Sequence, residues 1–300
     1  MKTLRCGFNK GTTDVRYRLP GLRFRSALRA QLSEEALNAI KDDQNARSKA
    51  YVESTPRKHI DLAYGPHERE RLDIFLPEND GAPMFAFIHG GYWQWNDKEG
   101  FEFLAKELNA AGAGFANIEY ALCPAVTIAE LTNQCRRAIA FLWREAGKYG
   151  YDASRIVVSG HSAGGHLTAM MQATDWPSFE DGLPMDVVAA GLPISGVYDL
   201  EPIRLTPLND AVRMGPEDVA EVSPMFMTPT STGPSVIAFG GAEYDEFDRQ
   251  ASDLAAAWAK HGMETSTLNL PGRDHFTALS ALAETDHALF AAAVKLLGLK

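Results

Sequence analysis

Apolar and polar residues alternate in blocks along the chain, and this pattern predicts alternating strands and helices. Short apolar runs are typical of buried strands, and longer segments with an apolar stripe are typical of helices. The predicted strands are residues 58–64, 70–76, 84–88, 114–120, 155–159, 187–194, 235–239 and 264–270. The predicted helices are residues 33–53, 98–111, 127–147, 163–173, 246–261 and 277–298. This alternation indicates an α/β fold, with a mostly parallel central sheet and helices on both faces.

The order of these elements favours one domain over residues 1–300, because no linker, internal repeat or low-complexity tract interrupts it. The 58–64 and 70–76 segments are expected to pair antiparallel. Residues 203–233, rich in Pro and Met, break the alternation and predict either a short cap or a long loop. Residues 1–55 are expected to form a basic N-terminal arm followed by a helix.

A serine between two glycines follows the predicted strand 155–159 and precedes the predicted helix 163–173. Residues 160–164 read G-H-S-A-G, which is the G-x-S-x-G pattern of a nucleophile elbow. In such an elbow a strained turn exposes the serine Oγ, and glycines let the strand and helix close around it. Ser162 is therefore the predicted nucleophile. The Ala163 N–H, at the start of the helix, is a predicted oxyanion donor.

A second motif supports this chemistry. The predicted strand 84–88 leads into residues 89–93, which read H-G-G-Y-W. In α/β-hydrolases a loop of the H-G-G-G type after an earlier strand completes the oxyanion hole. Gly90 and Gly91 are therefore predicted to supply backbone N–H groups to it, whereas His89 is expected to brace its own loop. Tyr92 and Trp93, next in the chain, are predicted to line the substrate pocket.

The general base and its carboxylate partner should follow the serine along the chain, in the order Ser, acid, His. His275 follows the predicted strand 264–270 and is the predicted base. Glu243 follows the predicted strand 235–239 and is the preferred acid, with Asp245 as runner-up and Glu246 third. His275 would take the Ser162 proton, and the carboxylate would orient the imidazole.

Several motifs together resemble those of kynurenine formamidase, also called arylformamidase. The resemblance covers roughly residues 45–295, and the Tyr92-Trp93 pair is its most discriminating part, because general esterases of this group usually continue with a third glycine. Its motifs are H-G-G-Y-W (89–93), G-H-S-A-G-G-H-L (160–167), P-I-S-G-V-Y-D-L-E-P (193–202), G-G-A-E-Y-D-E-F-D-R-Q (240–250) and D-H-F (274–276). The resemblance implies an α/β-hydrolase that cleaves an N-formyl arylamine of the N-formylkynurenine type to formate and amine. Similar members usually carry Asp where Glu243 stands, and Glu can do the same work on a longer side chain.

Composition agrees with an enzyme of this kind. The chain is 45% hydrophobic and 23% charged, as in ordinary globular proteins, and no apolar run approaches the ~18 residues of a membrane span. A net charge of −10 argues against nucleic-acid binding, although residues 1–50 hold 11 Lys and Arg against 5 Asp and Glu. Cys6, Cys123 and Cys135 form no paired framework. We therefore expect a cytoplasmic protein that does not bind membranes.

No spacing of His, Cys or carboxylates matches a metal motif, and no glycine-rich segment matches a nucleotide loop. The sequence thus predicts neither metal nor cofactor. His161 and His166, which flank the elbow, are expected to pack or hydrogen-bond near Ser162. Asp199 is a minor candidate for a supporting carboxylate and is more plausible as a helix cap.

Three functions fit these residues to different degrees. The first is the arylformamidase-like amidase, and the second is a carboxylesterase acting on small aryl esters, carbamates or other amides. Both use the same nucleophile and base, so only the shape of the pocket separates them. The third, a non-catalytic binding protein, is disfavoured because Ser162 and His275 are both present. The expected partner is a small aryl amide or ester, and the resemblance suggests a homodimer.

Overall fold

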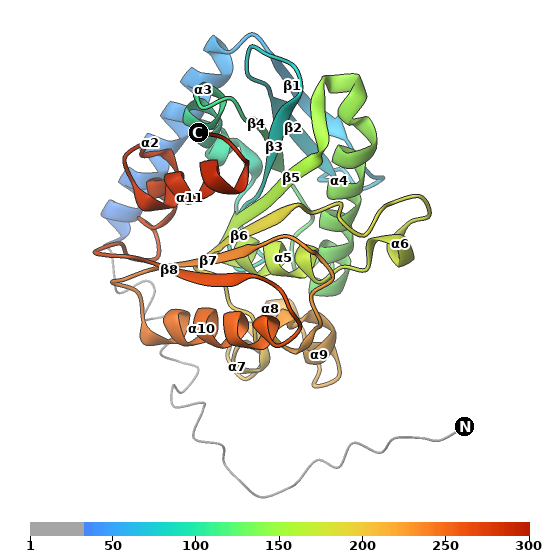
Figure 1. Ribbon diagram of the computed structural model, residues 1–300. Coiled ribbons are helices and arrows are strands. Elements are labelled where there is room, and N and C mark those ends of the chain that lie inside the picture. The colour runs from blue at the N-terminus through green and yellow to red at the C-terminus, as the bar shows by residue number, and fades with distance from the viewer. Residues whose placement is uncertain (1–32) are drawn as a thin grey trace, which may run out of the picture.

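An eight-stranded sheet runs through the centre of the computed structural model, which describes residues 33–300 (Figure 1). Its strands are β1 (Lys58–Ala63), β2 (Arg71–Phe75), β3 (Ala82–Ile88), β4 (Gly114–Ile118), β5 (Tyr151–His161), β6 (Ala190–Ile194), β7 (Ser235–Gly240) and β8 (Thr265–Leu270). They lie in the order β1-β2-β4-β3-β5-β6-β7-β8. The pairs β1–β2 and β2–β4 are antiparallel and the other pairs are parallel, which confirms the predicted mostly parallel sheet.

The helices and 3₁₀ turns connect these strands. They are α2 (Glu34–Ser54), η1 (Lys98–Leu104), α3 (Ala105–Ala110), α4 (Ile128–Tyr149), α5 (Ala163–Gln172), α6 (Trp176–Phe179), α7 (Glu201–Arg204), α8 (Asn209–Val212), α9 (Asp218–Val222), η2 (Pro224–Phe226), α10 (Asp245–Ala259), η3 (Leu279–Ala283) and α11 (Ala288–Leu296). The prediction of one helix over 277–298 was wrong, because η3 ends before Glu284 and α11 starts after His287. Glu284 has extended backbone and pairs with Arg273, and the His287 side chain accepts the Leu289 N–H as an N-cap.

Alternate residues of the central strands point to opposite faces and build two apolar layers. From β3, Phe85 and Phe87 enter the layer covered by α2, η1, α3, η3 and α11, whereas Met84, Ala86 and Ile88 enter the layer under α4, α5 and α10. Full burial of each large side chain contributes about 1.5–3 kcal/mol. Figure 1 shows α2, α3 and α11 together on one side of the sheet.

Side-chain caps fix the starts of two long helices. Ser33 Oγ accepts the Ala36 N–H at 3.1 Å, so α2 begins where the sequence predicts. Thr127 Oγ1 accepts the Glu130 N–H at 3.2 Å at the start of α4. The Glu130 carboxylate in turn accepts from Arg137 Nη2 at 2.9 Å, seven residues along α4.

The segment 203–233 holds the end of α7 followed by α8, α9 and η2, joined by short turns. Whether it acts as a cap stays a prediction.

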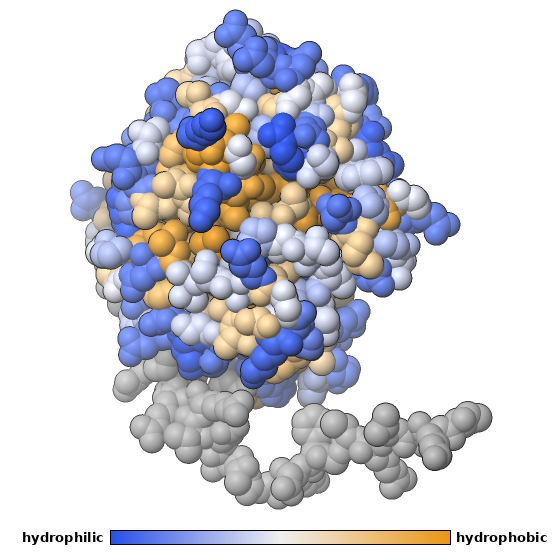
Figure 2. Space-filling view, in the orientation of Figure 1, coloured by the Kyte–Doolittle hydropathy of each residue, from blue (hydrophilic) through white to orange (hydrophobic). Residues whose placement is uncertain are grey.

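Most of the predicted basic arm, including Arg18, Arg23 and Arg25, lies outside the described residues, as does Cys6. Figure 2 shows an apolar area in the middle of the face that carries α11. The homodimer stays a prediction.

A buried lysine ties the first strands to η1. Lys98 Nζ lies 2.8 Å from Asp61 Oδ1, 2.9 Å from Asp73 Oδ2 and 2.9 Å from Glu99 Oε1, and its side chain is 2% exposed. Burial, together with the negative charge of the neighbouring Asp73, raises the pKa of Glu102 to about 8. The raised pKa favours a proton on Glu102 in the folded protein over a pH range in which the unfolded chain has released it.

This protonation makes stability depend on pH in a defined direction. Because the folded state holds a proton that the unfolded chain releases above its ordinary pKa of 4.5, the free energy of unfolding should fall as pH rises from about 5 to 8. Relative to Glu102→Gln, wild type should lose up to about 1.4 kcal/mol per pH unit. Urea unfolding at several pH values measures this. The exposed Glu78→Gln is the control, and parallel curves for wild type and Glu102→Gln would contradict the prediction.

Candidate active site

The structure places Ser162 on a strained turn between β5 and α5, as the sequence predicts. Its backbone has φ 58° and ψ −116°, a conformation that non-glycine residues rarely adopt. The Ser162 N–H donates to Ile194 O at 2.9 Å, and Ser162 O accepts the His166 N–H at 3.1 Å. These bonds to β6 and to α5 hold the turn in place.

Glycine is required beside this turn because three backbone segments meet there. A Cβ on Gly164 would overlap the carbonyl oxygens of Ile88 and His89, at the end of β3. A Cβ on Gly160 would meet Ile88 O at 2.5 Å. The glycines of G-x-S-x-G thus let β3 pass directly against the elbow, which brings residues 89–93 to the serine.

The structure also brings His275 and Glu243 to Ser162. Ser162 Oγ lies 3.0 Å from His275 Nε2, and His275 Nδ1 lies 2.5 Å from Glu243 Oε1. The side chains of His275 and Glu243 are 5% and 1% exposed, so water competes little for either contact. Contacts of this kind link a nucleophile, a general base and an orienting carboxylate in serine hydrolases, and these roles stay predictions for Ser162, His275 and Glu243.

The second oxygen of Glu243 is held by two donors that the sequence reasoning missed. Glu243 Oε2 accepts from Ser195 Oγ at 2.9 Å and from the Gly240 N–H at 2.6 Å. Ser195 follows β6 and has φ 50°, and its N–H donates to Ala238 O. The only signal in the sequence was its place in the P-I-S-G motif after a predicted strand.

The other carboxylates considered from sequence lie away from His275 Nδ1 or are engaged elsewhere. Asp245 is exposed at the start of α10, and Glu246 accepts from Arg249 and Gln250. Asp274 accepts the N–H groups of Phe276 and Thr277 in its own turn, and Asp199 Oδ1 caps α7 by accepting the Glu201 N–H. Among the described candidates, Glu243 is therefore the one hydrogen-bonded to His275.

The H-G-G-Y-W loop turns sharply beside the serine. Gly91, Tyr92 and Trp93 have φ values of 124°, 53° and 58° in succession. A Cβ placed on Gly90 would lie 3.1 Å from Ser162 Cβ, so the loop backbone lies against the serine. The Gly90 backbone and Ala163, the first residue of α5, therefore flank Ser162, and Gly91 is the next residue of the loop. Their action as oxyanion donors stays a prediction.

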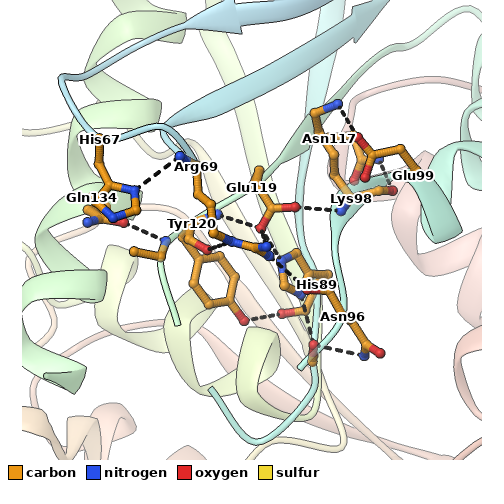
Figure 3. Close-up of polar contacts among 12 residues, drawn as sticks. His67, Arg69, His89, Asn96, Lys98, Glu99, Asn117, Glu119, Tyr120 and Gln134 are labelled. Atoms are coloured by element: carbon orange, nitrogen blue, oxygen red, sulfur yellow. Dashed lines mark hydrogen bonds and ion pairs between the residues drawn. The ribbon is translucent and has the colours of Figure 1, made fainter. Parts of the chain in front are cut away.

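A buried carboxylate that the sequence reasoning missed supports this loop from behind. Figure 3 shows Glu119 between Arg69 and His89, with the Lys98 backbone directed at its other oxygen. Glu119 Oε1 lies 2.6 Å from Arg69 Nη2 and 3.0 Å from His89 Nε2, and Oε2 accepts the Lys98 N–H at 2.8 Å. Burial raises the pKa of Glu119, but His89 and Arg69 outweigh it and lower that pKa below its usual value. The ionised Glu119 thus anchors His89.

His89 in turn contacts the glycine turn, which agrees with its predicted role of bracing its own loop. Its Nδ1 lies 2.8 Å from Gly90 O, which also accepts from Asn96 Nδ2 at 3.1 Å (Figure 3). The ring stacks on Tyr120, with ring centroids 4.3 Å apart, and the Tyr120 hydroxyl donates to His89 O. Each group is held by a neighbour, so the Gly90 carbonyl has a defined direction.

A small pocket opens at Ser162. The free space in it is about that of one water molecule, far below the ~300–1,000 Å³ usual for small-molecule sites. The lining residues are mostly apolar: Tyr92, Trp93, Ser162, Ala163, Val197, Ile203 and Phe247. Tyr92 and Trp93 therefore lie where the sequence predicts, and Ile203 comes from the segment predicted as a cap.

The two histidines beside the elbow serve as buried hydrogen-bonding groups. His161 Nε2 donates to His275 O at 2.7 Å, and His166 Nε2 donates to Val222 O at 2.7 Å. Burial, with the neighbouring His275, lowers the pKa of His161 to about 3, and burial lowers the pKa of His166 to about 4. Both rings are neutral at physiological pH, in agreement with their predicted packing role.

Within residues 33–300, no group of three or more His, Cys, Asp or Glu side chains is arranged to hold a metal ion. In the same range, no helix combines the length and apolar character needed to cross a membrane. Cys123 and Cys135 are buried, unpaired thiols whose pKa values burial raises.

Comparison with known proteins agrees with this geometry. The BD-FAE family profile matches residues 72–245, more than half of the chain. The kynurenine formamidase of Danio rerio is 30% identical over 246 residues, which is 80% of this chain and 82% of that protein. The chain belongs to the BD-FAE family and is an arylformamidase-like α/β-hydrolase.

Solved structures of similar proteins confirm the predicted fold of this α/β-hydrolase. A provisionally named thioesterase from Silicibacter sp. has a TM-score of 0.77 and 30% identity, and the match covers 88% of this chain and 95% of that one. An esterase from the archaeon Pyrobaculum calidifontis has a TM-score of 0.71 and 18% identity, covering 91% and 96% respectively. The arylformamidase-like protein is thus an enzyme on a scaffold shared with esterases.

The support of the loop by Glu119 predicts a kinetic effect at a distance from the serine. Glu119→Gln should lower kcat for a p-nitrophenyl ester by about 10- to 100-fold with little change in KM, because a displaced loop weakens contacts made in the transition state. Complete loss of one oxyanion donor lowers kcat by about 10²–10³-fold. Glu130→Gln, a half-exposed carboxylate in α4, is the control. A lower melting temperature with unchanged kcat would show that Glu119 acts on stability alone.

Proposed function

We propose that this enzyme is a serine hydrolase that cleaves N-formyl arylamines of the N-formylkynurenine type to formate and the free amine. The observation that carries the proposal is the chain of contacts from Ser162 through His275 to Glu243, in a protein 30% identical to a kynurenine formamidase. The aromatic side chains of Tyr92, Trp93 and Phe247 beside Ser162 suit an aryl substrate, and the little free space there suits a very small acyl group.

Each contact has a chemical role in this proposal. His275 Nε2 accepts the proton of Ser162 as Oγ attacks the formyl carbonyl carbon, and Glu243 stabilises the imidazolium that forms. The N–H groups of Gly90, Gly91 and Ala163 stabilise the negative oxygen of the tetrahedral intermediate. The imidazolium then gives its proton to the departing amine nitrogen, and the C–N bond breaks. Water, activated by His275, hydrolyses the formyl-serine ester to release formate.

A carboxylesterase that acts on small aryl esters, carbamates or other amides is the second candidate. It passes through the same acyl-enzyme, and the fold shared with esterases and a thioesterase favours it. The two functions differ only in the leaving group that the pocket accepts.

Activity on the two substrate types distinguishes these candidates. We expect kcat/KM for N-formyl-L-kynurenine of about 10⁴ M⁻¹s⁻¹ or more, the low end of the range for dedicated enzymes. A p-nitrophenyl ester is measured beside it, and Ser162→Ala serves as the blank, because loss of the nucleophile should lower kcat by several orders of magnitude. Fast ester cleavage with negligible formamide turnover would favour the carboxylesterase, and retained turnover in Ser162→Ala would refute the nucleophile.

The acid assignment has its own test. Glu243→Gln should lower kcat by up to about 10⁴-fold, because an amide facing His275 favours the wrong imidazole tautomer. Asp245→Asn, two residues along the chain and exposed, should retain nearly full activity. Steady-state kinetics of both variants decides the matter, and the reverse ranking would make Asp245 the acid.

A further inference from the structure

Contacts of both its backbone and its indole side chain hold Trp93 in place. Trp93 is 1% exposed and lines the pocket that contains Ser162. Its carbonyl oxygen accepts the Cys123 N–H at 2.7 Å, and its Nε1–H donates to His166 Nδ1 at 3.2 Å. The two rings meet edge to face, with centroids 5.2 Å apart at 87°. Trp93 therefore has little freedom to rotate out of the pocket wall.

His166 connects this wall to two other elements. It lies on α5, one helical turn after Ser162, and is fully buried. Because its Nε2–H donates to Val222 O, Nδ1 is left as the acceptor for the indole. Val222 belongs to α9, within the 203–233 segment. The neutral His166 thus joins the pocket wall to the nucleophile helix and to this segment.

One contact of a pocket residue indicates where the leaving group lies. A leaving group must reach His275 Nε2 to receive a proton, and Phe247, which lines the pocket, lies against the His275 ring at 4.8 Å. The end near His275 and Phe247 therefore suits the leaving group. In the proposed mechanism, the carbonyl oxygen points to the loop of Gly90 and Gly91. Because the leaving group and the carbonyl oxygen take these two directions, the acyl substituent is directed toward Trp93.

We propose that Trp93, held by His166, is the wall of the acyl side of the pocket and restricts the substrate to formyl and acetyl groups. The proposal rests on the proposed role of Ser162 as nucleophile. A longer acyl chain would have to displace a buried indole that is hydrogen-bonded to His166. The restriction would apply to esters as well as amides, whichever leaving group the enzyme prefers.

The chain-length profile of ester hydrolysis tests this assignment. We compare kcat/KM for p-nitrophenyl acetate, butyrate and octanoate in wild type, Trp93→Ala and Trp93→Phe. A methylene group that a pocket accepts or refuses changes kcat/KM by about 10- to 200-fold. Trp93→Ala should therefore raise the ratio of butyrate to acetate by at least about 10-fold, and Trp93→Phe should raise it less. His166→Asn should shift the ratio in the same direction by releasing the indole.

Trp258→Phe is the matched control. Trp258 is also fully buried and donates its Nε1–H to a protein oxygen, Pro224 O, but it does not line the pocket. It should leave the ratio unchanged while showing how the loss of a buried indole affects stability. If Trp93→Ala does not fold, the butyrate-to-acetate ratios of Trp93→Phe and Trp258→Phe are compared instead.

The outcomes separate this proposal from the proposed function. An unchanged chain-length profile in folded Trp93 variants overturns the acyl wall while Ser162-dependent hydrolysis stands. If the Trp93 variants instead hydrolyse acetates of larger phenols better than wild type does, Trp93 lies at the leaving-group side of the pocket. This result also overturns the proposal. If wild type hydrolyses no ester or formamide and a fluorophosphonate does not label Ser162, the nucleophile itself fails.

Discussion

The close approach of three backbone segments around Ser162 is the constraint on which the site depends. The ends of β3 and β6 touch the turn between β5 and α5, through the glycine contacts at Ile88 and the bond from the Ser162 N–H to Ile194 O. The serine keeps a positive φ because the packed sheet and helix fix both sides of it. The same approach brings the Gly90 backbone against Ser162, so one packing arrangement positions both the serine turn and the adjoining loop.

Two buried carboxylates stabilise this arrangement, and the surroundings compensate both charges. A buried carboxylate without partners is strongly unfavourable. Glu243 has three partners in His275, Ser195 and the Gly240 N–H, and Glu119 is surrounded by Arg69, His89 and backbone donors. The first orients the histidine next to the serine, and the second orients the loop. Loss of any one partner would leave a charge poorly solvated, which explains why both networks are densely connected.

Glutamate at position 243 is a departure from the aspartate usual in similar enzymes, and the structure shows how the longer side chain fits. One carboxylate oxygen reaches His275 while the other remains within 2.6 Å of the N–H of Gly240, three residues earlier. Ser195 provides the remaining contact from β6. The extra methylene is therefore accommodated by anchoring the far oxygen to the end of β7.

The sequence alone determined the α/β fold and the turn at Ser162. It also determined the position of the glycine loop after β3 and that of His275 after β8. These features depend on local rules: strand and helix periodicity, and a motif whose glycines satisfy a strict backbone geometry. The sequence also predicted a single helix over 277–298, and this prediction was wrong. Hydrophobic periodicity does not reveal the side-chain cap at His287 or the Glu284–Arg273 ion pair, which divide the segment. The tertiary structure alone showed that Glu243 contacts His275, and it revealed the contacts of Ser195 and Glu119 and the one between Trp93 and His166. Those depend on which side chains meet from segments 30 to 73 residues apart, and only the packed sheet sets that distance.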